Sequence, residues 1–301
     1  MQADLIVLLN SQELYREVMS NWDGRFAGDP VWKFKVLMGV PRADQIKVLR
    51  EALPNGGEFL FLTDSYAELR DFVIDSVRTV WLNRNGDFVH DIYPIHNVEI
   101  RTLDELSRVM PMLNKPTLSQ CLRWWDAWEV PENVRSHSRA VSRSAYVLAV
   151  MMKNRGLTVD PILAHRAGLL HDIDKITTLN SGVHGAVGAE FILEKGYPGI
   201  AEIVRNHIMS TILEPGANEM CWEDKLVYFC DKLVEGYQIV PFDQRLQALK
   251  VRYPLYIEIM EQAESAIWAL SDEICFILEI AGHQHLVTLL RKFNQTSAEV
   301  H

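Results

Sequence analysis

Cysteine is scarce in this sequence, and the few cysteines are not closely paired along the chain. The 301 residues contain four cysteines, and no two of them form a Cys-x-x-Cys motif. Small secreted domains depend on disulfides, whereas a chain of this length with so few cysteines needs no disulfide framework. We therefore expect buried, reduced thiols in a cytoplasmic protein at Cys121, Cys221, Cys230 and Cys275.

Long apolar runs are also missing. The apolar run at residues 5–9 is short and follows Asp4, so it lacks the basic region and the length of a signal peptide. No stretch approaches the roughly 18 uninterrupted apolar residues that a membrane-spanning helix requires. We expect a soluble protein that has no membrane partner.

Positive charge is in deficit. Lysine and arginine number 30 against 40 aspartates and glutamates, which gives a formal net charge of −10. A surface with this balance repels polyanions, so we expect no polymeric nucleic acid as a partner. Hydrophobic residues make up 48% and charged residues 23%, which is ordinary globular composition and excludes a disordered chain. The length predicts roughly two domains.

The first 115 residues alternate between strand-like and helix-like patterns. We predict strands at residues 5–9, 59–62, 79–82 and 98–100, and helices at 11–19, 44–53, 66–74 and 103–110. Such alternation predicts a parallel α/β sheet of the Rossmann type. Beyond this point the pattern is helical, with proline or glycine at the joints and no convincing strand. We therefore predict an α/β domain at 1–115 and an all-α domain at 116–301.

Half of the ten histidines fall between His137 and His207. Asp160-Pro161 is a typical helix start, and the helix that it opens leads to the doublet His171-Asp172 within an apolar frame. The other candidates lie on apolar faces or at the starts of neighbouring helices: His137, His184, His207 and Asp231.

A single buried histidine is usually a hydrogen-bonded core residue, and we interpret His165 in that way. Asp231 alone would be explained by an ion pair with Lys232 or Lys175. Four histidines and two aspartates together are different, because inward-pointing polar groups are costly unless they are paired or coordinated. The set predicts a metal site.

The order of these residues is His, then His-Asp, then Asp, in three local motifs: Arg135-Ser-His-Ser138, Ala167-Gly-Leu-Leu-His-Asp-Ile-Asp-Lys175 and Tyr228-Phe-Cys-Asp-Lys232. Over about residues 130–236 the sequence resembles the HD superfamily of metal-dependent phosphohydrolases. His184 and His207 match the extra histidines of its binuclear members. Asp174 departs from the commonest family pattern, which has glycine there.

The resemblance implies a role for each of these residues. His137, His171, Asp172 and Asp231 would hold a first metal ion, and Asp172 would bridge to a second ion held by His184 and His207. Imidazole and carboxylate ligands suit one or two divalent ions of Mn, Fe, Zn, Co or Ni without choosing among them. Asp172 and Lys175 would be catalytic, with Lys175 neutralising charge that develops on a phosphoryl group; a surface lysine is the alternative.

Arg135, Arg139 and Arg143 recur every four residues beside His137. Arg139 is our candidate for binding an anionic substrate, and a solvated helix face is the alternative. The expected substrate is a phosphomonoester, phosphodiester or anhydride of a nucleotide or another small metabolite. Two other functions stay open, a di-iron oxygenase of the HD type and a non-catalytic metal-binding signalling module. A homodimer is compatible with the sequence.

Residues 40–110 resemble the late part of the haloacid dehalogenase fold, through Phe59-Leu-Phe-Leu-Thr-Asp-Ser65 and Thr79-Val-Trp-Leu-Asn-Arg-Asn-Gly86. Enzymes of that fold need an aspartate nucleophile after the first strand. Asn10 follows the first strand here, and an amide cannot form an aspartyl-phosphate. Asp64 remains as a metal ligand without an evident partner. We therefore expect a degenerate, non-catalytic domain.

Three tryptophans, Trp124, Trp125 and Trp128, precede the first histidine helix. Such a cluster can stack a nucleobase, but we expect it to pack helices.

Overall fold

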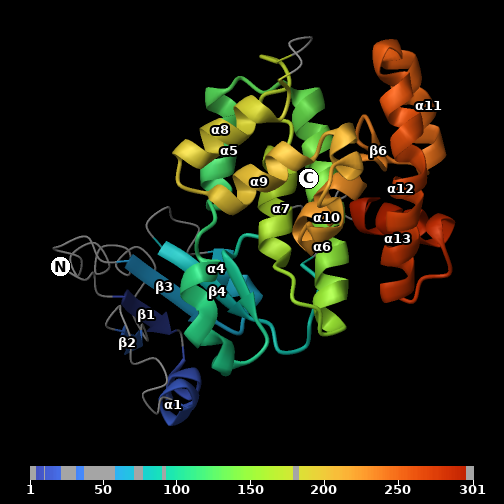
Figure 1. The fold of residues 1–301 in the computed structure, drawn as a ribbon. Coiled ribbons are helices and arrows are strands. Elements are labelled where there is room, and N and C mark those ends of the chain that lie inside the picture. The colour runs from blue at the N-terminus through green and yellow to red at the C-terminus, as the bar shows by residue number, and fades with distance from the viewer. Residues whose placement is uncertain are drawn as a thin grey trace. The chain divides into compact units, whose positions relative to one another are not determined.

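The computed structural model describes residues 5–9, 11–21, 32–36, 58–70, 77–89, 93–178 and 183–295. The chain divides into two units, drawn in Figure 1. The first comprises Met1–Asp87 with Ile95–Gln120, and the second comprises Phe88–Pro94 with Cys121–His301. The boundary that we place near residue 115 stays a prediction.

The first unit is built on a parallel sheet. Within the described residues its strand order is β2-β1-β3-β4-β5, and every neighbouring pair is parallel. The strands are β1 (Leu5–Leu9), β2 (Trp32–Val36), β3 (Glu58–Thr63), β4 (Val77–Leu82) and β5 (Val98–Ile100). The strand order changes direction between β1 and β3. The parallel sheet is confirmed, whereas its haloacid dehalogenase-like identity stays a prediction.

Strand β2 was missing from our expectations. Its residues Trp-Lys-Phe-Lys-Val alternate between apolar and charged side chains, the pattern of an edge strand with one covered face. Strands β1 and β3, which lie inside the sheet, are more continuously apolar.

The described helices that lie wholly in the first unit are short: α1 (Gln12–Asn21), α3 (Tyr66–Leu69), the 3₁₀ helix η2 (Leu103–Arg108) and α4 (Val109–Met112). Ser11 caps α1, because its Oγ accepts a hydrogen bond from the Leu14 amide at 3.0 Å. The apolar core includes Val7, Leu14, Leu60, Val80 and Ile100. The helix predicted at 44–53, the part of the predicted 66–74 helix beyond Arg70, and Asn10 lie outside the described residues.

The second unit is helical. Its elements are α5 (Leu118–Ala127, which begins in the first unit), α6 (Glu132–Asn154), α7 (Pro161–Leu170), α8 (Ala186–Glu194), α9 (Pro198–Asn206), α10 (Trp222–Asp231), α11 (Phe242–Arg252), α12 (Ile257–Ile277) and α13 (His283–Gln295). The 3₁₀ helices are η3 (Met209–Leu213), η4 (Ala217–Glu219) and η5 (Pro254–Tyr256). None of the described helices is long and apolar enough to cross a membrane.

Our expectation that no strand occurs beyond residue 115 was wrong. Strands β6 (Val234–Glu235) and β7 (Gln238–Ile239) form a small antiparallel hairpin directly after α10. Strands of two residues are too short to show a repeating pattern. The turn between them uses Gly236 at a φ of 61°, a conformation that favours glycine.

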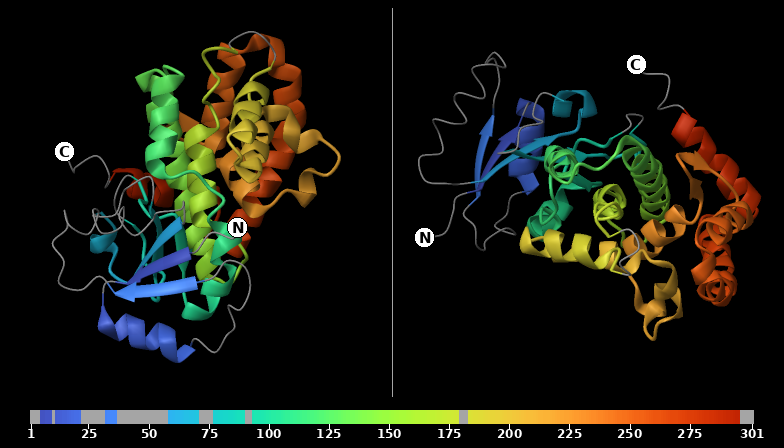
Figure 2. Two further views of the ribbon diagram at one scale, coloured as in Figure 1. Left: turned by 90° about the vertical axis from the view of Figure 1, so that its left-hand side faces the viewer. Right: turned by 90° about the horizontal axis from the view of Figure 1, so that it is seen from above.

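Helices α6 and α7 pack against each other within the second unit. Helices α8 and α9 lie on one side of this pair, and α11, α12 and α13 lie on the other (Figures 1 and 2). The approach of α6 to α7 is close, because a Cβ atom at Gly168 would lie 2.7 Å from the Cα atom of Ser142. This contact brings the helix that carries His137 alongside the one that leads to His171.

The tryptophans pack against helices, as expected. Trp125 is buried, and its indole donates a hydrogen bond to the Leu169 carbonyl at 3.0 Å. The rings of Trp124 and Trp128 meet the ring of Phe191 edge-on.

All four cysteines are free thiols. Cys121, Cys230 and Cys275 are buried as expected, but Cys221 is exposed. The exposure of Cys221 has a local cause, because this residue is the N-cap of α10 and follows the loop segment that contains η4. Burial still raises the pKa of its thiol to about 12, so the group stays protonated at neutral pH.

Candidate metal centre

The six predicted ligand residues lie at or near helix ends. His171 and His207 directly follow α7 and α9, and Asp231 is the last residue of α10. His184 precedes α8, and His137 lies in the second turn of α6. The C-termini of helices carry partial negative charge from their unpaired carbonyl groups. Three such ends, those of α7, α9 and α10, therefore favour a cation at this point.

The structure brings the six residues together in two groups of three. Within the described part of the chain, His137, His171 and Asp231 form one group, and Asp172, His184 and His207 form the other. Each group has one ligand atom per residue within 4.8 Å of the others. In the first group the Nε2 atom of His137 lies 2.9 Å from Asp231 Oδ1.

Asp172 belongs to the second group but also faces the first, because its two carboxylate oxygens face different groups. Its Oδ2 atom is 3.7 Å from His137 Nε2 and 3.5 Å from His171 Nε2. Its Oδ1 atom is 3.0 Å from His184 Nε2 and 3.6 Å from His207 Nε2. This is the arrangement that a carboxylate bridging two ions requires.

All four imidazoles are held by the nitrogen that faces away from the centre. The Nδ1 atoms of His171 and His207 donate to the carbonyls of Gly168 and Val204 at 2.8 and 2.6 Å, three residues back along the chain. Such bonds place the lone pair on Nε2, which is the usual state of a metal-binding histidine.

The other two rings are held in the same way. The Nδ1 atom of His137 donates to the Gly236 carbonyl at 3.0 Å, and that of His184 donates to Asp174 Oδ1 at 2.8 Å. The β6–β7 hairpin, which the sequence patterns missed, therefore supports a predicted ligand.

Two features of the Nε2 atoms fit a metal ion. The Nε2 atom of His171 is buried and has no hydrogen-bond partner among the described residues. The Nε2 atoms of His184 and His207 lie 3.1 Å apart, although their outer nitrogens are both committed as donors. Two facing lone pairs repel each other unless a proton or a cation lies between them.

The charges within the centre are those of a cation site. Burial lowers the pKa of His137, and it lowers that of His207 to about 4, so both rings are neutral at pH 7. Burial alone would raise the pKa of Asp172, but Lys175 and His171 hold it well below its usual range. Asp231 is kept ionised in the same manner by Lys232 and His137.

His184 differs from the other rings because it is partly exposed, with 31% of its side chain accessible. Burial lowers its pKa, but the hydrogen bonds with Asp172 and Asp174 outweigh that effect and raise it to about 9. In the absence of a metal ion this ring therefore carries a proton, which a metal ion would replace.

Comparison with known proteins agrees with this geometry. The HD domain family matches residues 134–235. An uncharacterized protein of Methanocaldococcus jannaschii is 37% identical over 133 residues, which cover 40% of this chain and 78% of that protein. No solved structure matches the chain.

The chain belongs to the HD domain family.

The HD domain family is one of metal-dependent hydrolases in general, and the matched segment runs from three residues before His137 to four beyond Asp231. All six candidate ligands therefore lie inside it. The resemblance inferred from the sequence motifs is confirmed over residues 134–235.

Lys175 of the HD domain lies against the centre. Its Nζ atom is 2.5 Å from Asp172 Oδ2, and 29% of its side chain is exposed. Burial lowers its pKa, but Asp172 and Asp231 outweigh burial and raise it, so the ammonium group stays charged. The ion pair of Asp231 with Lys232, which we considered as an alternative explanation of Asp231, is also present at 2.7 Å.

Arg139 is committed to other partners. Its guanidinium donates to the Tyr93 hydroxyl at 2.6 Å and pairs with Glu132. The predicted basic stripe is not one exposed face, because Arg143 is buried at 2% exposure and Arg135 donates to the Val130 carbonyl. Substrate binding by Arg139 stays a prediction.

Two other sequence expectations concern His165 and Asp64. His165 is fully buried and belongs to neither ligand group, as expected of a structural residue. Asp64 is exposed after β3, and within the described residues it joins no group of metal-competent side chains.

Asp174 and Arg245 are residues of the centre that sequence reasoning missed. Asp174 is fully buried and holds His184 through Oδ1, while its Oδ2 atom accepts the Gly188 amide at 2.7 Å. The sequence feature that could have pointed to Asp174 is its position after the His-Asp doublet, where the commonest family pattern has glycine. The guanidinium of Arg245 lies 4.0 Å from Asp231. No sequence pattern pointed to Arg245, because it comes from α11, outside the motif.

Proposed function

We propose that the HD domain is a binuclear metal-dependent phosphohydrolase that acts on a small phosphorylated molecule. His137, His171 and Asp231 would hold one divalent ion and His184 and His207 the other, with Asp172 shared between them. Divalent ions supply Lewis-acid activation of phosphoryl oxygens and of water when they are bound. Mn, Fe, Zn, Co and Ni all suit this set of ligands.

The single observation that carries the proposal is the position of Asp172. One carboxylate oxygen faces His137 and His171, and the other faces His184 and His207. A mononuclear site needs only one of these two groups. The outward hydrogen bonds of all four imidazoles support the same assignment, because each leaves the inner nitrogen as a ligand.

Lys175 is the side chain that we assign to the substrate. Its charged side chain is partly exposed beside the buried Asp172, so we expect an anionic group that approaches the centre to meet it. A fixed positive charge at this place stabilises negative charge that develops on a phosphoryl group. Asp172 and Lys175 are thus the proposed catalytic residues, and Arg139 is the proposed substrate-binding residue.

The net charge of the chain limits the class of substrate that we propose. A net charge of −10 disfavours a polymeric nucleic acid but permits a small anion that is attracted locally. We propose a phosphomonoester, phosphodiester or anhydride of a nucleotide or another small metabolite, handled in the cytoplasm, where free thiols stay reduced. A homodimer is compatible with this function.

The test begins with the metal content of the purified full-length protein, measured by elemental analysis. A panel of phosphorylated metabolites is then assayed with the metal that is found. We expect about two ions per chain, and we expect the combined variant His171→Ala, Asp172→Ala to lose both the bound metal and phosphate release. His285→Ala removes one exposed histidine from α13 and serves as the matched control.

Retained turnover in the combined variant, with the fold intact by circular dichroism, would refute the proposal. So would a wild-type protein that takes up no metal from supplemented medium, which would favour a non-catalytic module. Substrate-dependent oxygen uptake with iron bound would assign the same ligands to an oxygenase.

For the first unit we propose a degenerate, non-catalytic haloacid dehalogenase-like domain. The support is the parallel sheet together with Asn10 in place of a nucleophilic aspartate. In the full-length chain with His171→Ala and Asp172→Ala, Mg²⁺ should restore no hydrolysis of p-nitrophenyl phosphate. Mg²⁺-dependent hydrolysis in that variant would contradict this assignment.

A further inference from the structure

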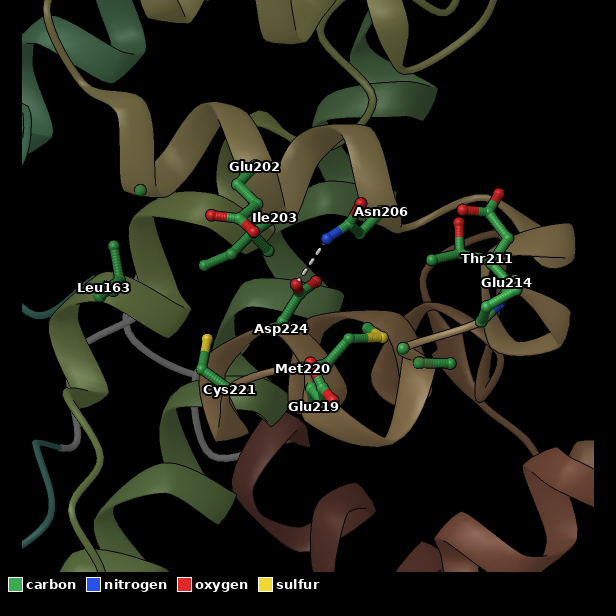
Figure 3. Close-up of a pocket in the computed structure, with 14 residues that line it drawn as sticks. Leu163, Glu202, Ile203, Asn206, Thr211, Glu214, Glu219, Met220, Cys221 and Asp224 are labelled. Carbon is green, nitrogen blue, oxygen red and sulfur yellow. Dashed lines mark hydrogen bonds between the residues drawn. The ribbon is translucent and has the colours of Figure 1, made fainter.

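A pocket lies in the helical unit, apart from the six candidate ligands. It is lined by α9, by the segment that contains η3 and η4, by the first turn of α10 and by Leu163 of α7 (Figure 3). Its volume is about 470 Å³, within the range of small-molecule sites, roughly 300–1,000 Å³. None of the six candidate metal ligands belongs to the lining.

The lining of this pocket carries negative charge. Asp224, Glu202, Glu214 and Glu219 all contribute to it, and the described lining residues include no lysine, arginine or histidine. The carboxylates of Glu202, Glu214 and Glu219 are on exposed residues, whereas Asp224 is only 3% exposed.

The two carboxylate oxygens of Asp224 differ in their hydrogen bonding. Its Oδ2 atom accepts a hydrogen bond from Asn206 Nδ2 at 2.7 Å, as Figure 3 shows. Its Oδ1 atom is buried and has no hydrogen-bond partner among the described residues. A buried carboxylate oxygen without a donor is costly, so its presence in the wall of a pocket indicates that a ligand supplies the donor.

The electrostatic surroundings of Asp224 also favour a positive charge beside it. Burial raises the pKa of Asp224 to about 7; the Asn206 hydrogen bond opposes this effect, and the charges of Glu202 and Glu223 add to it. A carboxyl group in this state is stabilised by a cation that binds beside it.

A metal ion does not fit this arrangement. Divalent ions need several ligand atoms at short distance. Within the described residues the carboxylates of the pocket form no group of three that converges within 4.8 Å. The lining also contains apolar side chains, those of Leu163, Ile203 and Met220, which suit a hydrocarbon chain.

We propose that this pocket binds a small aliphatic amine whose ammonium group donates to the Asp224 carboxylate, which turns on binding so that Oδ1 faces the pocket. The hydrocarbon part lies against Ile203 and Met220, and the exposed Glu214 and Glu219 attract the ligand to the pocket. The site is independent of the proposed hydrolysis, because none of the six metal ligands takes part in it.

The test is calorimetric titration of the metal-loaded full-length protein with 1,4-diaminobutane, at about pH 8 so that Asp224 is ionised. The neutral probe 1,4-butanediol has nearly the same shape. We expect saturable binding of the diamine, weaker binding of n-butylamine, and none of the diol.

Asp224→Asn should weaken binding of the diamine by at least about tenfold, because a charge-assisted hydrogen bond is lost. Glu194→Gln removes one exposed negative charge from α8 and should leave binding unchanged. The double variant Glu214→Gln, Glu219→Gln changes only exposed residues and should weaken binding about threefold, which keeps the test decisive if Asp224→Asn does not fold.

Three results would overturn the proposal. The first is an absence of saturable binding of the diamine. The second is equal binding of the diamine and the diol. The third is binding of Mg²⁺ or Ca²⁺ that is abolished by Asp224→Asn, which would make the pocket a metal site.

Discussion

Asp174 Oδ1 accepts the Nδ1–H of His184 at 2.8 Å, while its other oxygen accepts the Gly188 amide at 2.7 Å. One carboxylate therefore links the His-Asp motif to the first turn of α8 and orients an imidazole between them. The close fit explains the glycine, because a Cβ at Gly188 would lie 2.9 Å from Ile173 Cγ2.

Asp174→Asn should selectively weaken the second metal ion. The amide keeps the shape of the side chain but is a weaker acceptor for the Nδ1–H, so the ring loses its orientation and basicity. We expect metal affinity to fall about 10- to 100-fold at the site of His184 and His207. Elemental analysis should then find about one ion per chain, whereas Glu190→Gln on α8 retains both. Two tightly bound ions in Asp174→Asn would show that Asp174 does not position His184.

Lys175→Met should separate catalysis from metal binding. The apolar side chain keeps most of the length of lysine but removes the charge that pairs with Asp172. We expect kcat/KM for the phosphorylated substrate to fall about 100-fold, with an unchanged metal content. A loss of metal together with activity would instead show that Lys175 maintains the ligand Asp172.

Arg139→Gln should raise KM for the phosphorylated substrate about three- to tenfold, with little change in kcat, because a positive group that attracts the anion is lost. Tyr93→Phe is the control, since it removes the hydroxyl that Arg139 contacts but leaves the guanidinium charge. An unchanged KM in Arg139→Gln would remove Arg139 from substrate binding.

Asp224 should make the stability of the protein fall with rising pH. Its pKa rises from an ordinary 3.8 in the unfolded chain to about 7 in the folded one, because of burial and despite the Asn206 hydrogen bond. The folded state therefore binds more protons between these values, so this contribution is complete below about pH 4 and lost as pH approaches 7. The titratable groups that interact with Asp224 are Glu202 on α9, Glu223 on α10 and Cys221 at the N-cap of α10.

Asp224→Asn removes that dependence. Relative to wild type, the variant should gain unfolding free energy as pH rises from about 4 to 7, by an amount on the order of 4 kcal/mol, and the difference should then level off. Urea unfolding of both proteins at several pH values measures it. A difference that does not change with pH would show that Asp224 titrates normally.

Local chemistry made much of the helical unit predictable. The Asp160-Pro161 cap forms as expected, with Asp160 Oδ1 accepting the amides of Ile162 and Leu163. The six candidate ligands were identified from polar groups on apolar faces or at helix ends, together with the order of the HD motif. The parallel sheet followed from runs of apolar residues.

What sequence patterns missed depends on packing between distant segments. Asp174 can orient His184 only because α8 packs against the turn that follows α7. His137 is held by the Gly236 carbonyl, which lies 99 residues away in the sequence. The partners of Arg139 and the burial of Arg143 likewise depend on neighbours that a four-residue repeat does not reveal.

The convergence of helix ends described above has a consequence for folding. His137 and Asp231 are 94 residues apart in sequence, and the six ligand residues come from α6, α10 and the ends of helices between them. In the unfolded chain these groups are scattered, so an ion that binds them strongly binds the folded state almost alone. Each bound metal ion would then act as a cross-link that closes long loops of the helical unit, and its binding energy would add directly to the cohesion of the fold.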